Sequence, residues 1–282
     1  MDCIKQIVGV TPQKEGDNTY SPSKLALKLA VEKKTDYASV DFGTKNQDHS
    51  KRILIVGTET ELLKMENGKM FQTGNHPVEL FVPMLHWQAA GYSLDIATPT
   101  GAPLQLERWA LPTEDSAVME LFEAYKPKLA QPLDLRQLVD HLDENSPYVA
   151  VYFPGGHGVI ADLPFSDAVS QVVNWCSSQD KHMISICHGP SAFLSTGASS
   201  PYSGYAISAC PDGMDKLLPP TGYLPGSMPW FFGEKLRALD IKVVNKIMNG
   251  KVMIDRKLIT GDGPKAANEL GIVSAMALLN EI

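Results

Sequence analysis

The chain has 282 residues, of which 44% are hydrophobic and 20% charged, and this composition predicts a globular protein with a large core and no need for disulfides. The formal net charge of −7 and the isoelectric point near 5.5 argue against binding to nucleic acid or to an anionic membrane. No apolar run is long enough to cross a bilayer, and the first residues do not resemble a signal peptide. Four cysteines, Cys3, Cys176, Cys187 and Cys210, form no C-x-x-C pair, so we expect a cytoplasmic protein.

Residues 1–50 are polar and weakly periodic, and we interpret them as an N-terminal extension packed on the core, with a flexible arm as the alternative. Within them, the apolar residues between Leu25 and Val31 predict a short amphipathic helix or a strand. The first clear buried strand covers residues 52–57 and is followed by a polar loop over 58–70, with a turn at Asn67-Gly68.

A helix is predicted from Asn75 to about Ala90, with Gly91 as its C-terminal cap, and a strand over residues 92–98. The order strand, helix, strand requires parallel pairing with a right-handed crossover. Residues 101–146 contain two helical segments, near 116–126 and 133–142, which three prolines separate and which we interpret as an inserted helical lobe.

The second half of the chain returns to alternating strands and helices. We predict that Cys176 lies in the core, because it shares one helix face with Val169, Val172 and Val173. The predicted elements are strands over 148–153, 183–186, 205–210 and 258–260, helices over 167–177, 230–239 and 264–279, a loop over 217–229, and a hairpin of 242–245 with 252–254. The result is an α/β fold with a mostly parallel sheet, in which residues 51–282 form one domain.

The stretch from Met183 to Ala192 has the layout of a nucleophile elbow. A short apolar strand ends at Cys187-His188, Gly189-Pro190 breaks the extended chain, and a helix begins immediately afterwards. A helix N-terminus favours the thiolate form of a nearby cysteine. Because neighbouring side chains on a strand point to opposite faces, Cys187 and His188 act together only if the chain bends, and we assign the bend to Gly189. The alternative is a cysteine that is only part of the core.

Three further positions could complete such a site. Gly155-Gly156 directly follows a buried strand and could present backbone N–H groups to an oxyanion, or it could be a simple turn. Glu79 in the first helical turn is either a proton carrier facing the thiol or an acid that complements the helix dipole. Asp215 could orient His188, with Asp212 and Glu234 as competing carboxylates.

A dedicated metal site is not predicted. His76 and His86 are ten residues apart, and His182 and His188 flank a strand, so neither pair has the spacing of an H-x-x-x-H site.

Taken together, these residues resemble a known family. Cys187-His188-Gly189-Pro190, preceded by Pro154-Gly155-Gly156-His157-Gly158, is similar to the PfpI-like branch of the class I glutamine amidotransferase-like superfamily. Four further motifs narrow the resemblance to the larger HchA-type members, which are heat-inducible chaperones and glyoxalase III enzymes. The resemblance covers nearly the whole chain from about Asp17 onward. These motifs are Asn75-His76-Pro77-x-Glu79, Pro211-Asp212-x-x-Asp215-Lys216, Trp230-Phe231-Phe232-Gly233-Glu234 and Leu258-Ile259-Thr260-Gly261-Asp262.

The resemblance implies a flavodoxin-like three-layer sandwich with a smaller lobe, assembled as a homodimer. It places the nucleophile on Cys187, its histidine on His188, the orienting aspartate on Asp215 and a protonated glutamate on Glu79. The oxyanion hole falls on the Gly155-Gly156 turn. The implied reaction is glutathione-independent and cofactor-free: methylglyoxal becomes lactate, and glyoxal becomes glycolate, through a hemithioacetal on the thiol.

One feature departs from the family. Members from enteric bacteria carry a two-histidine, one-carboxylate metal site near the thiol, and the matching positions here are Gln88, Ser93 and Tyr125. We therefore expect no zinc.

Other functions compatible with the resemblance are removal of early glycation adducts from proteins, holdase binding of unfolded proteins, and cysteine peptidase activity. Oxidation of Cys187 to a sulfinate is a further side reaction.

Overall fold

The computed structural model describes residues 9–281, so Cys3 and the start of the N-terminal extension lie outside the described residues. Its main sheet has seven strands in the order β12-β13-β9-β8-β3-β6-β7, and only β12 is antiparallel to its neighbour. The strands are β3 (Arg52–Val56), β6 (Ser93–Thr98), β7 (Leu133–Asp134), β8 (Tyr148–Phe153), β9 (His182–Ile186), β12 (Val252–Asp255) and β13 (Leu258–Gly261). The predicted α/β fold with a mostly parallel sheet is confirmed.

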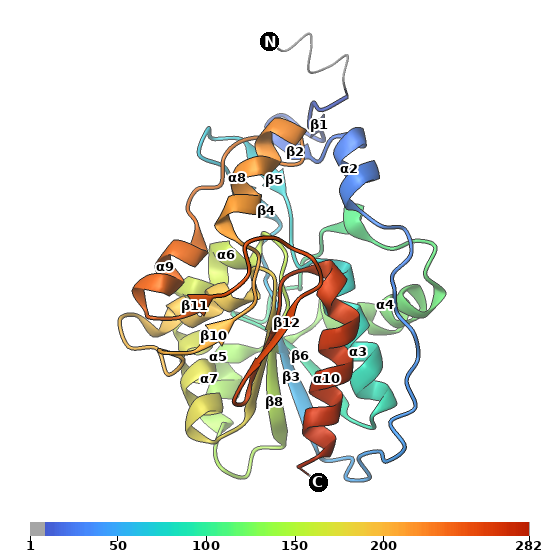
Figure 1. The fold of residues 1–282 in the computed structure, drawn as a ribbon, viewed down its shortest axis with the longest axis vertical. Helices are drawn as coiled ribbons and strands as arrows, with labels where there is room; N and C mark the ends of the chain where they lie inside the picture. Colours follow the sequence, from blue (N-terminus) through green and yellow to red (C-terminus); the bar gives the residue numbers. More distant parts are fainter. Residues whose placement is uncertain (1–8, 282) are drawn as a thin grey trace.

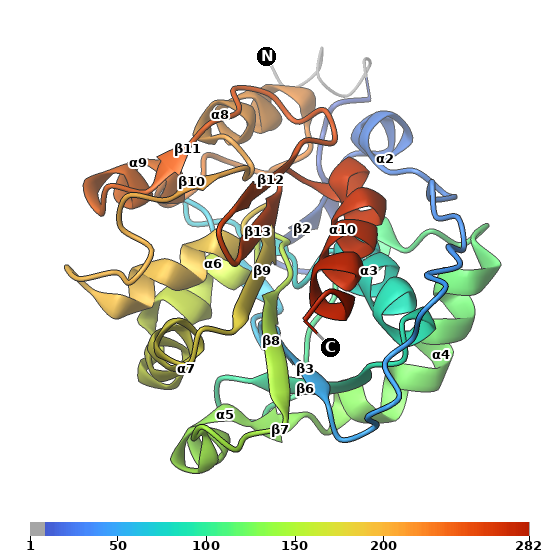
Figure 2. The same cartoon turned by 60° about the horizontal axis from the view of Figure 1, so that its bottom comes forward.

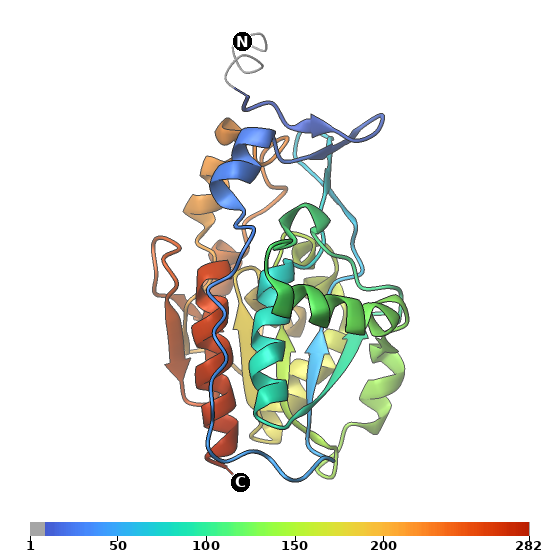
Figure 3. The same ribbon diagram turned by 90° about the vertical axis from the view of Figure 1, so that its right-hand side faces the viewer.

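Helices cover both faces of this sheet and complete a three-layer sandwich (Figures 2 and 3). One face carries α3 (Pro77–Ala89), α4 (Ser116–Ala130) and α10 (Ala267–Leu279). The other carries α6 (Val159–Asp162), α7 (Asp167–Ser178) and the 3₁₀ helix η4 (Gly189–Thr196). Because both faces are covered, the central strands are nearly continuous apolar runs, as in the fully buried Ile53 to Val56 of β3.

Two of the helices approach each other closely at a glycine. The α3 and α10 helices run side by side (Figure 1), and the Trp87 indole N–H of α3 donates a 2.8 Å hydrogen bond to Ser274 Oγ of α10. A Cβ added to Gly271 would lie 2.6 Å from His86 Cδ2 and 2.9 Å from Pro83 Cα.

Cys176 is fully buried in α7, as its helical spacing predicts.

The N-terminal part of the chain joins a second, smaller sheet with the order β1-β2-β5-β4. Its strands are β1 (Gln13–Lys14), β2 (Thr19–Ser21), β4 (Leu62–Lys64) and β5 (Met70–Gln72), and α2 (Lys24–Ala30) follows β2. The prediction of a loop over 58–70 is therefore wrong: the Asn67-Gly68 turn, with Gly68 at φ +82°, connects two paired strands.

Proline caused two further errors in the predicted boundaries. The α4 helix continues through Pro127 to Ala130, because Leu121, Tyr125 and Leu129 keep burying one face while the proline lies on the exposed face. The helical segment predicted near 133–142 is present but shorter: β7 is followed by α5 (Leu135–Leu138) and the 3₁₀ helix η2 (Val139–His141). Likewise α8 (Asp212–Thr221) includes Pro219-Pro220, where a loop was predicted, and ends at the left-handed Gly222.

The predicted hairpin of residues 242–245 with 252–254 is also wrong. The β12 strand pairs with β13 through the tight turn Arg256-Lys257, in which Arg256 has φ +55°. The β11 strand (Lys242–Val243) pairs in parallel with β10 (Ala206–Ile207), which is much shorter than the predicted strand over 205–210. The helix α9 (Phe232–Ala238) lies between β10 and β11 in the chain, and the 3₁₀ helix η5 (Pro264–Ala266) leads into α10.

No described helix has both the length and the apolar character required to span a membrane.

Candidate active site

Cys187 lies at a sharp backbone corner at the carboxyl end of β9. Its φ is +59°, which is unusual for a residue other than glycine, and its backbone is held on both sides. The Cys187 N–H donates to the Gly261 carbonyl at 2.9 Å, and the Cys187 carbonyl accepts from the Cys210 N–H at 3.0 Å. The bend assigned to Gly189 is therefore at Cys187 itself. Gly189 instead allows close approach, because a Cβ there would lie 2.6 Å from Ser185 Oγ.

The structure brings together the predicted thiol, imidazole and carboxylate. Cys187 Sγ lies 3.2 Å from His188 Nδ1, and His188 Nε2 lies 2.9 Å from Asp215 Oδ2. Asp215 is in the first turn of α8 and is almost fully buried. The two competing acids are engaged elsewhere: Asp212 accepts from the Gly233 N–H at 2.8 Å, and Glu234 pairs with Lys216 at the surface.

Electrostatics favour a charged Asp215 and a basic His188. Burial alone would raise the pKa of Asp215, but the nearby His188 and His157 outweigh it and hold the pKa well below its usual value. Burial alone would lower the pKa of His188, yet the Asp215 charge raises it above its usual range. The ionised Asp215 holds a proton on Nε2, and Nδ1 faces the sulfur, in position to exchange a proton with the thiol.

Burial of Cys187 opposes the thiolate form that a helix N-terminus favours. Burial raises the pKa of the Cys187 thiol well above its usual value, and the adjacent Cys210 and Glu79 add to the shift. The helix that begins at Gly189 is a 3₁₀ helix, and the thiol is only 6% exposed. Desolvation therefore outweighs the helix dipole, and the thiol needs His188 as a base.

Glu79 projects from the first turn of α3 into the same cavity. Neither of its carboxyl oxygens has a hydrogen-bond partner among the described residues, although both are buried. Burial raises the pKa of Glu79 to about 8, and interaction with Cys187 only partly opposes this shift. The carboxyl group is thus protonated at neutral pH and free to interact with a ligand.

The turn at Gly155-Gly156 separates Glu79 from Cys187. A Cβ on Gly155 would lie 2.6 Å from Cys187 Cβ and would overlap a Glu79 carboxyl oxygen, so only glycine fits. Gly156 has φ +105°. No backbone carbonyl among the described residues accepts the N–H of Gly156 or His188. These donors are at the expected position of an oxyanion hole, a role that stays a prediction.

Two residues that the sequence analysis left without a role extend the hydrogen-bonded chain. His157 Nε2 lies 3.4 Å from Asp215 Oδ1, and His157 Nδ1 lies 3.2 Å from Glu107 Oε1. Burial alone would lower the pKa of His157, but its two carboxylate neighbours raise it to about 9. His157 directly follows the Gly155-Gly156 turn, and this position was the only feature of the sequence that could have indicated its role. Glu107 comes from the predicted lobe, and no motif pointed to it.

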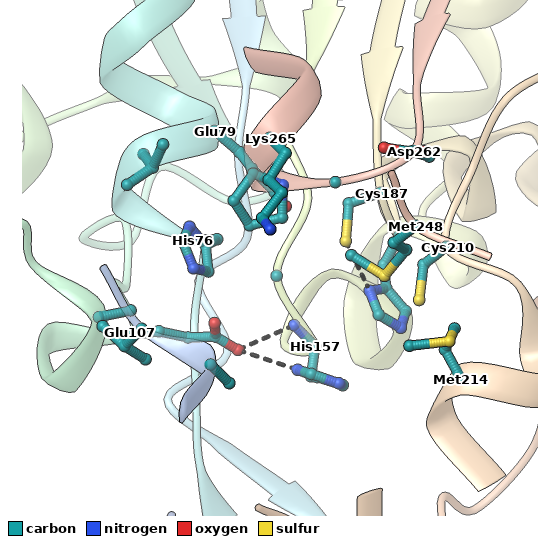
Figure 4. Close-up of a pocket in the computed structure, with 18 of the residues that line it drawn as sticks. His76, Glu79, Glu107, His157, Cys187, Cys210, Met214, Met248, Asp262 and Lys265 are labelled. Carbon is teal, nitrogen blue, oxygen red and sulfur yellow. Dashed lines mark hydrogen bonds and ion pairs between the residues drawn. The ribbon is translucent and has the colours of Figure 1, made fainter. Parts of the chain in front are cut away.

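These side chains line a cavity of about 400 Å³ (Figure 4). Cys187 and His157 face it from beyond the carboxyl ends of β9 and β8, where α/β folds bind ligands, and Glu79 faces it from the first turn of α3. Residues 30–32 and 35–36 of the N-terminal segment also line it, and we call them the roof. The exposed Glu32, Asp36 and Lys265 mark its mouth.

The residues at the positions of the family's metal site do not fit zinc. The Gln88 amide donates a 3.0 Å hydrogen bond to the Tyr125 hydroxyl, and Ser93 is the first residue of β6. An amide, a neutral phenol and a hydroxyl are poor zinc ligands. Two groups of ligand-type atoms, each within 4.8 Å, do occur in the active site: Cys187, His188 and Cys210, and His157, His188 and Asp215. That no metal is required stays a prediction.

No family model matches the chain. It is 41% identical over 276 residues to a protein/nucleic acid deglycase HchA of Pseudomonas aeruginosa, covering 95% of this chain and 94% of the relative. It is 40% identical over 277 residues to the protein of the same name from Staphylococcus aureus, with 96% and 95% covered. A crystal structure of glyoxalase III from Candida albicans superposes with a TM-score of 0.63 at 19% identity, covering 80% of this chain and 98% of that one. With the fold, the cysteine corner and this full-length similarity in agreement, the chain belongs to the HchA family.

Proposed function

We propose that the protein is an enzyme that removes reactive dicarbonyl aldehydes, without glutathione or another cofactor, through a covalent adduct on Cys187. The observation that carries this proposal is Glu79, a buried carboxyl group with a pKa of about 8 and no hydrogen-bond partner among the described residues, next to a thiol that has its own base. Such a pair supplies both a nucleophile and a separate proton carrier.

In this scheme, the Cys187 sulfur attacks the aldehyde carbon of methylglyoxal while its proton passes to His188 Nδ1. The N–H groups of Gly156 and His188 receive the oxyanion, which His188 then protonates to give a hemithioacetal. Glu79 gives its proton to the ketone oxygen and removes the hydrogen from the sulfur-bearing carbon, which forms an enediol. Glu79 next protonates the second carbon and takes the hydroxyl proton from the first. Water hydrolyses the resulting thioester to lactate.

Deglycation uses the same first adduct. When the aldehyde carbon already carries an amine as a hemiaminal, the sulfur attacks that carbon, the carbon–nitrogen bond breaks and the amine leaves with a proton. The two bacterial relatives are named protein/nucleic acid deglycases, which supports this extension. We propose glycated proteins as the larger substrates, since the net charge of −7 disfavours nucleic acid. The homodimer stays a prediction.

The test measures lactate formed from methylglyoxal in glutathione-free buffer, together with release of free amine from a glycated peptide. Cys187→Ser should reduce both rates roughly 10³-fold or more. Glu79→Gln should reduce lactate formation by about 10²- to 10⁴-fold and leave formation of the hemithioacetal detectable by mass spectrometry. Glu234→Gln, on the surface, is the matched control. Unchanged lactate formation by Cys187→Ser would refute the proposal.

Holdase activity is a separate function, because it would not depend on the thiol. A holdase should suppress the aggregation of a heat-denatured client equally well as wild type and as Cys187→Ala. A loss of suppression in that variant would link it to the active site.

A further inference from the structure

A second thiol lies beside the nucleophile and has no role in the scheme above. Cys210 follows the short strand β10, and its N–H donates to the Cys187 carbonyl at 3.0 Å. The Cys210 and Cys187 sulfur atoms lie within 4.8 Å of each other and of a His188 ring nitrogen. Both thiols line the cavity, and Figure 4 shows them on the same side of it, with the Met248 side chain drawn between them. Any small oxidant that reaches one sulfur therefore reaches the pair.

The backbone geometry is compatible with a disulfide bond. Chain segments joined by a backbone hydrogen bond of this kind lie about 4.8 Å apart. A spacing of this size falls within the Cα separation of roughly 4.4–6.8 Å that disulfides span.

We propose that Cys187 and Cys210 form a reversible disulfide when a hydroperoxide enters the cavity, so that the protein consumes the peroxide and its nucleophile escapes irreversible oxidation. Cys187 is the residue oxidised first, because its sulfur lies 3.2 Å from His188 Nδ1, with which it exchanges its proton. Cys210 is the resolving thiol.

The reaction balances in two steps. The Cys187 sulfur attacks one peroxide oxygen, the oxygen–oxygen bond breaks, and the leaving alkoxide or hydroxide takes a proton from His188. The product is a sulfenic acid. The Cys210 sulfur then attacks the Cys187 sulfur, the sulfur–oxygen bond breaks, and hydroxide leaves as water with the Cys210 proton. Two thiols have lost two electrons and the peroxide has gained them. A small thiol reductant restores both cysteines.

Without Cys210, no other thiol of the described residues is within reach of the sulfenic acid. The other described cysteine, Cys176, lies in α7, where its sulfur contacts the His182 carbonyl at 3.4 Å. It does not line the cavity. Further peroxide would then convert Cys187 to the sulfinic acid, which thiol reductants do not reverse. Cys176 is thus the matched control for Cys210.

The experiment treats the full-length wild type, Cys210→Ser, Cys210→Ala and Cys176→Ala with one and with ten equivalents of hydrogen peroxide. Peptide mass spectrometry then identifies the state of Cys187, and thiols are counted before and after dithiothreitol. We expect wild type and Cys176→Ala to lose two thiols per chain, to yield a peptide linking Cys187 to Cys210, and to recover both with dithiothreitol. Both Cys210 variants should lose the Cys187 thiol and accumulate sulfinic acid that dithiothreitol does not reverse.

The wild-type cross-link is read without any variant, so a Cys210 substitution that unfolds the chain does not leave the proposal untested. Sulfinic acid on wild-type Cys187 without the cross-link, or equal thiol recovery in wild type and both Cys210 variants, would overturn it. These measurements detect sulfur oxidation directly, so they are independent of which aldehyde the enzyme converts.

Discussion

Glu79, whose burial is unfavourable, is also a residue that the proposed chemistry needs. Glu79 is fully buried, and its oxygens have no partner among the described residues, an arrangement that lowers stability unless the group stays protonated. Its neighbours Cys187 and His188 differ in this respect, because each has a partner. The site therefore retains one acid that is costly for folding but available to a substrate.

This cost predicts how stability depends on pH. Folding raises the pKa of Glu79 from 4.5 to about 8, so the folded chain holds a proton that the unfolded chain releases between these values. The free energy of unfolding should therefore fall as the pH rises through this window. Glu79→Gln should lack this contribution and be more stable than wild type at pH 7 by on the order of 3 kcal/mol. Urea denaturation from pH 5 to 8 measures the difference, with Glu234→Gln as the control.

The position of His157 between two carboxylates leads to a different pH dependence. Its pKa is raised from 6.5 to about 9, so its ion pairs with Asp215 and Glu107 are fully present below pH 6.5 and are lost as the pH rises through about 9. Wild type should be more stable than His157→Asn near pH 6, and the difference should shrink toward pH 9. A difference that stays constant with pH would contradict this role.

The same substitution tests whether His157 positions Asp215. We expect kcat/KM for methylglyoxal to fall about 10- to 100-fold in His157→Asn, the effect of losing one charge-assisted hydrogen bond. Asp215→Asn should cost about 10⁴-fold, because His188 then loses the partner that holds its tautomer. Equal losses in the two variants would argue against an indirect role.

Among the elements, the sequence predicted most accurately the central strands, which are covered by helices on both faces. The apolar runs of β3, β8 and β9 gave boundaries within about a residue or two, because hardly any other element can bury so continuous a run. The prolines within α4 and α8 led to wrong predicted helix boundaries. A proline interrupts a helix only if the lost hydrogen bond is not offset, and in α4 the buried stripe continues past it. Short strands such as β10 depend on a distant partner and carry little local signal.

The packing of α3 against α10 depends on one missing side chain. Gly271→Ala should be destabilising by about 1–3 kcal/mol, because the new methyl group would meet the Pro83 backbone at 2.9 Å and the His86 ring at 2.6 Å. Gly213→Ala in α8 is the matched control. It has no neighbour within 4 Å and should be neutral or gain up to about 1 kcal/mol from helix propensity. Thermal denaturation of both variants checks the prediction.

For the whole molecule, the site is an assembly of segments that are far apart in the chain. Cys187 and His188 were predictable because strand, turn and helix follow one another in the sequence. The Glu107–His157 pair was not, because Glu107 arrives with the segment before α4 and contacts His157 only in the folded chain. The roof over the cavity was missed for the same reason: nothing in a polar N-terminal segment indicates what it covers.

One tether of the roof is Thr35. Its N–H donates to Asp115 Oδ2 at 3.1 Å and its hydroxyl donates to the same oxygen. Thr35→Val keeps the shape and loses the hydroxyl hydrogen bonds, so local opening should become roughly tenfold more frequent. Limited proteolysis should cut residues 31–50 faster in this variant. The rate of amine release from bulky glycated peptides should rise relative to the rate of methylglyoxal conversion. Lys33→Ala, which removes only an exposed ion pair with Glu114, should change neither rate.

Under the proposed function, the position of the sulfur inside a roofed cavity limits how a large client could be repaired. A cavity of about 400 Å³ is too small for a folded client, so a damaged side chain would have to reach into it. Glycated lysines and arginines on tails and mobile loops of the client would react first, one adduct per binding event. An adduct buried inside a folded client would react only after that client unfolds.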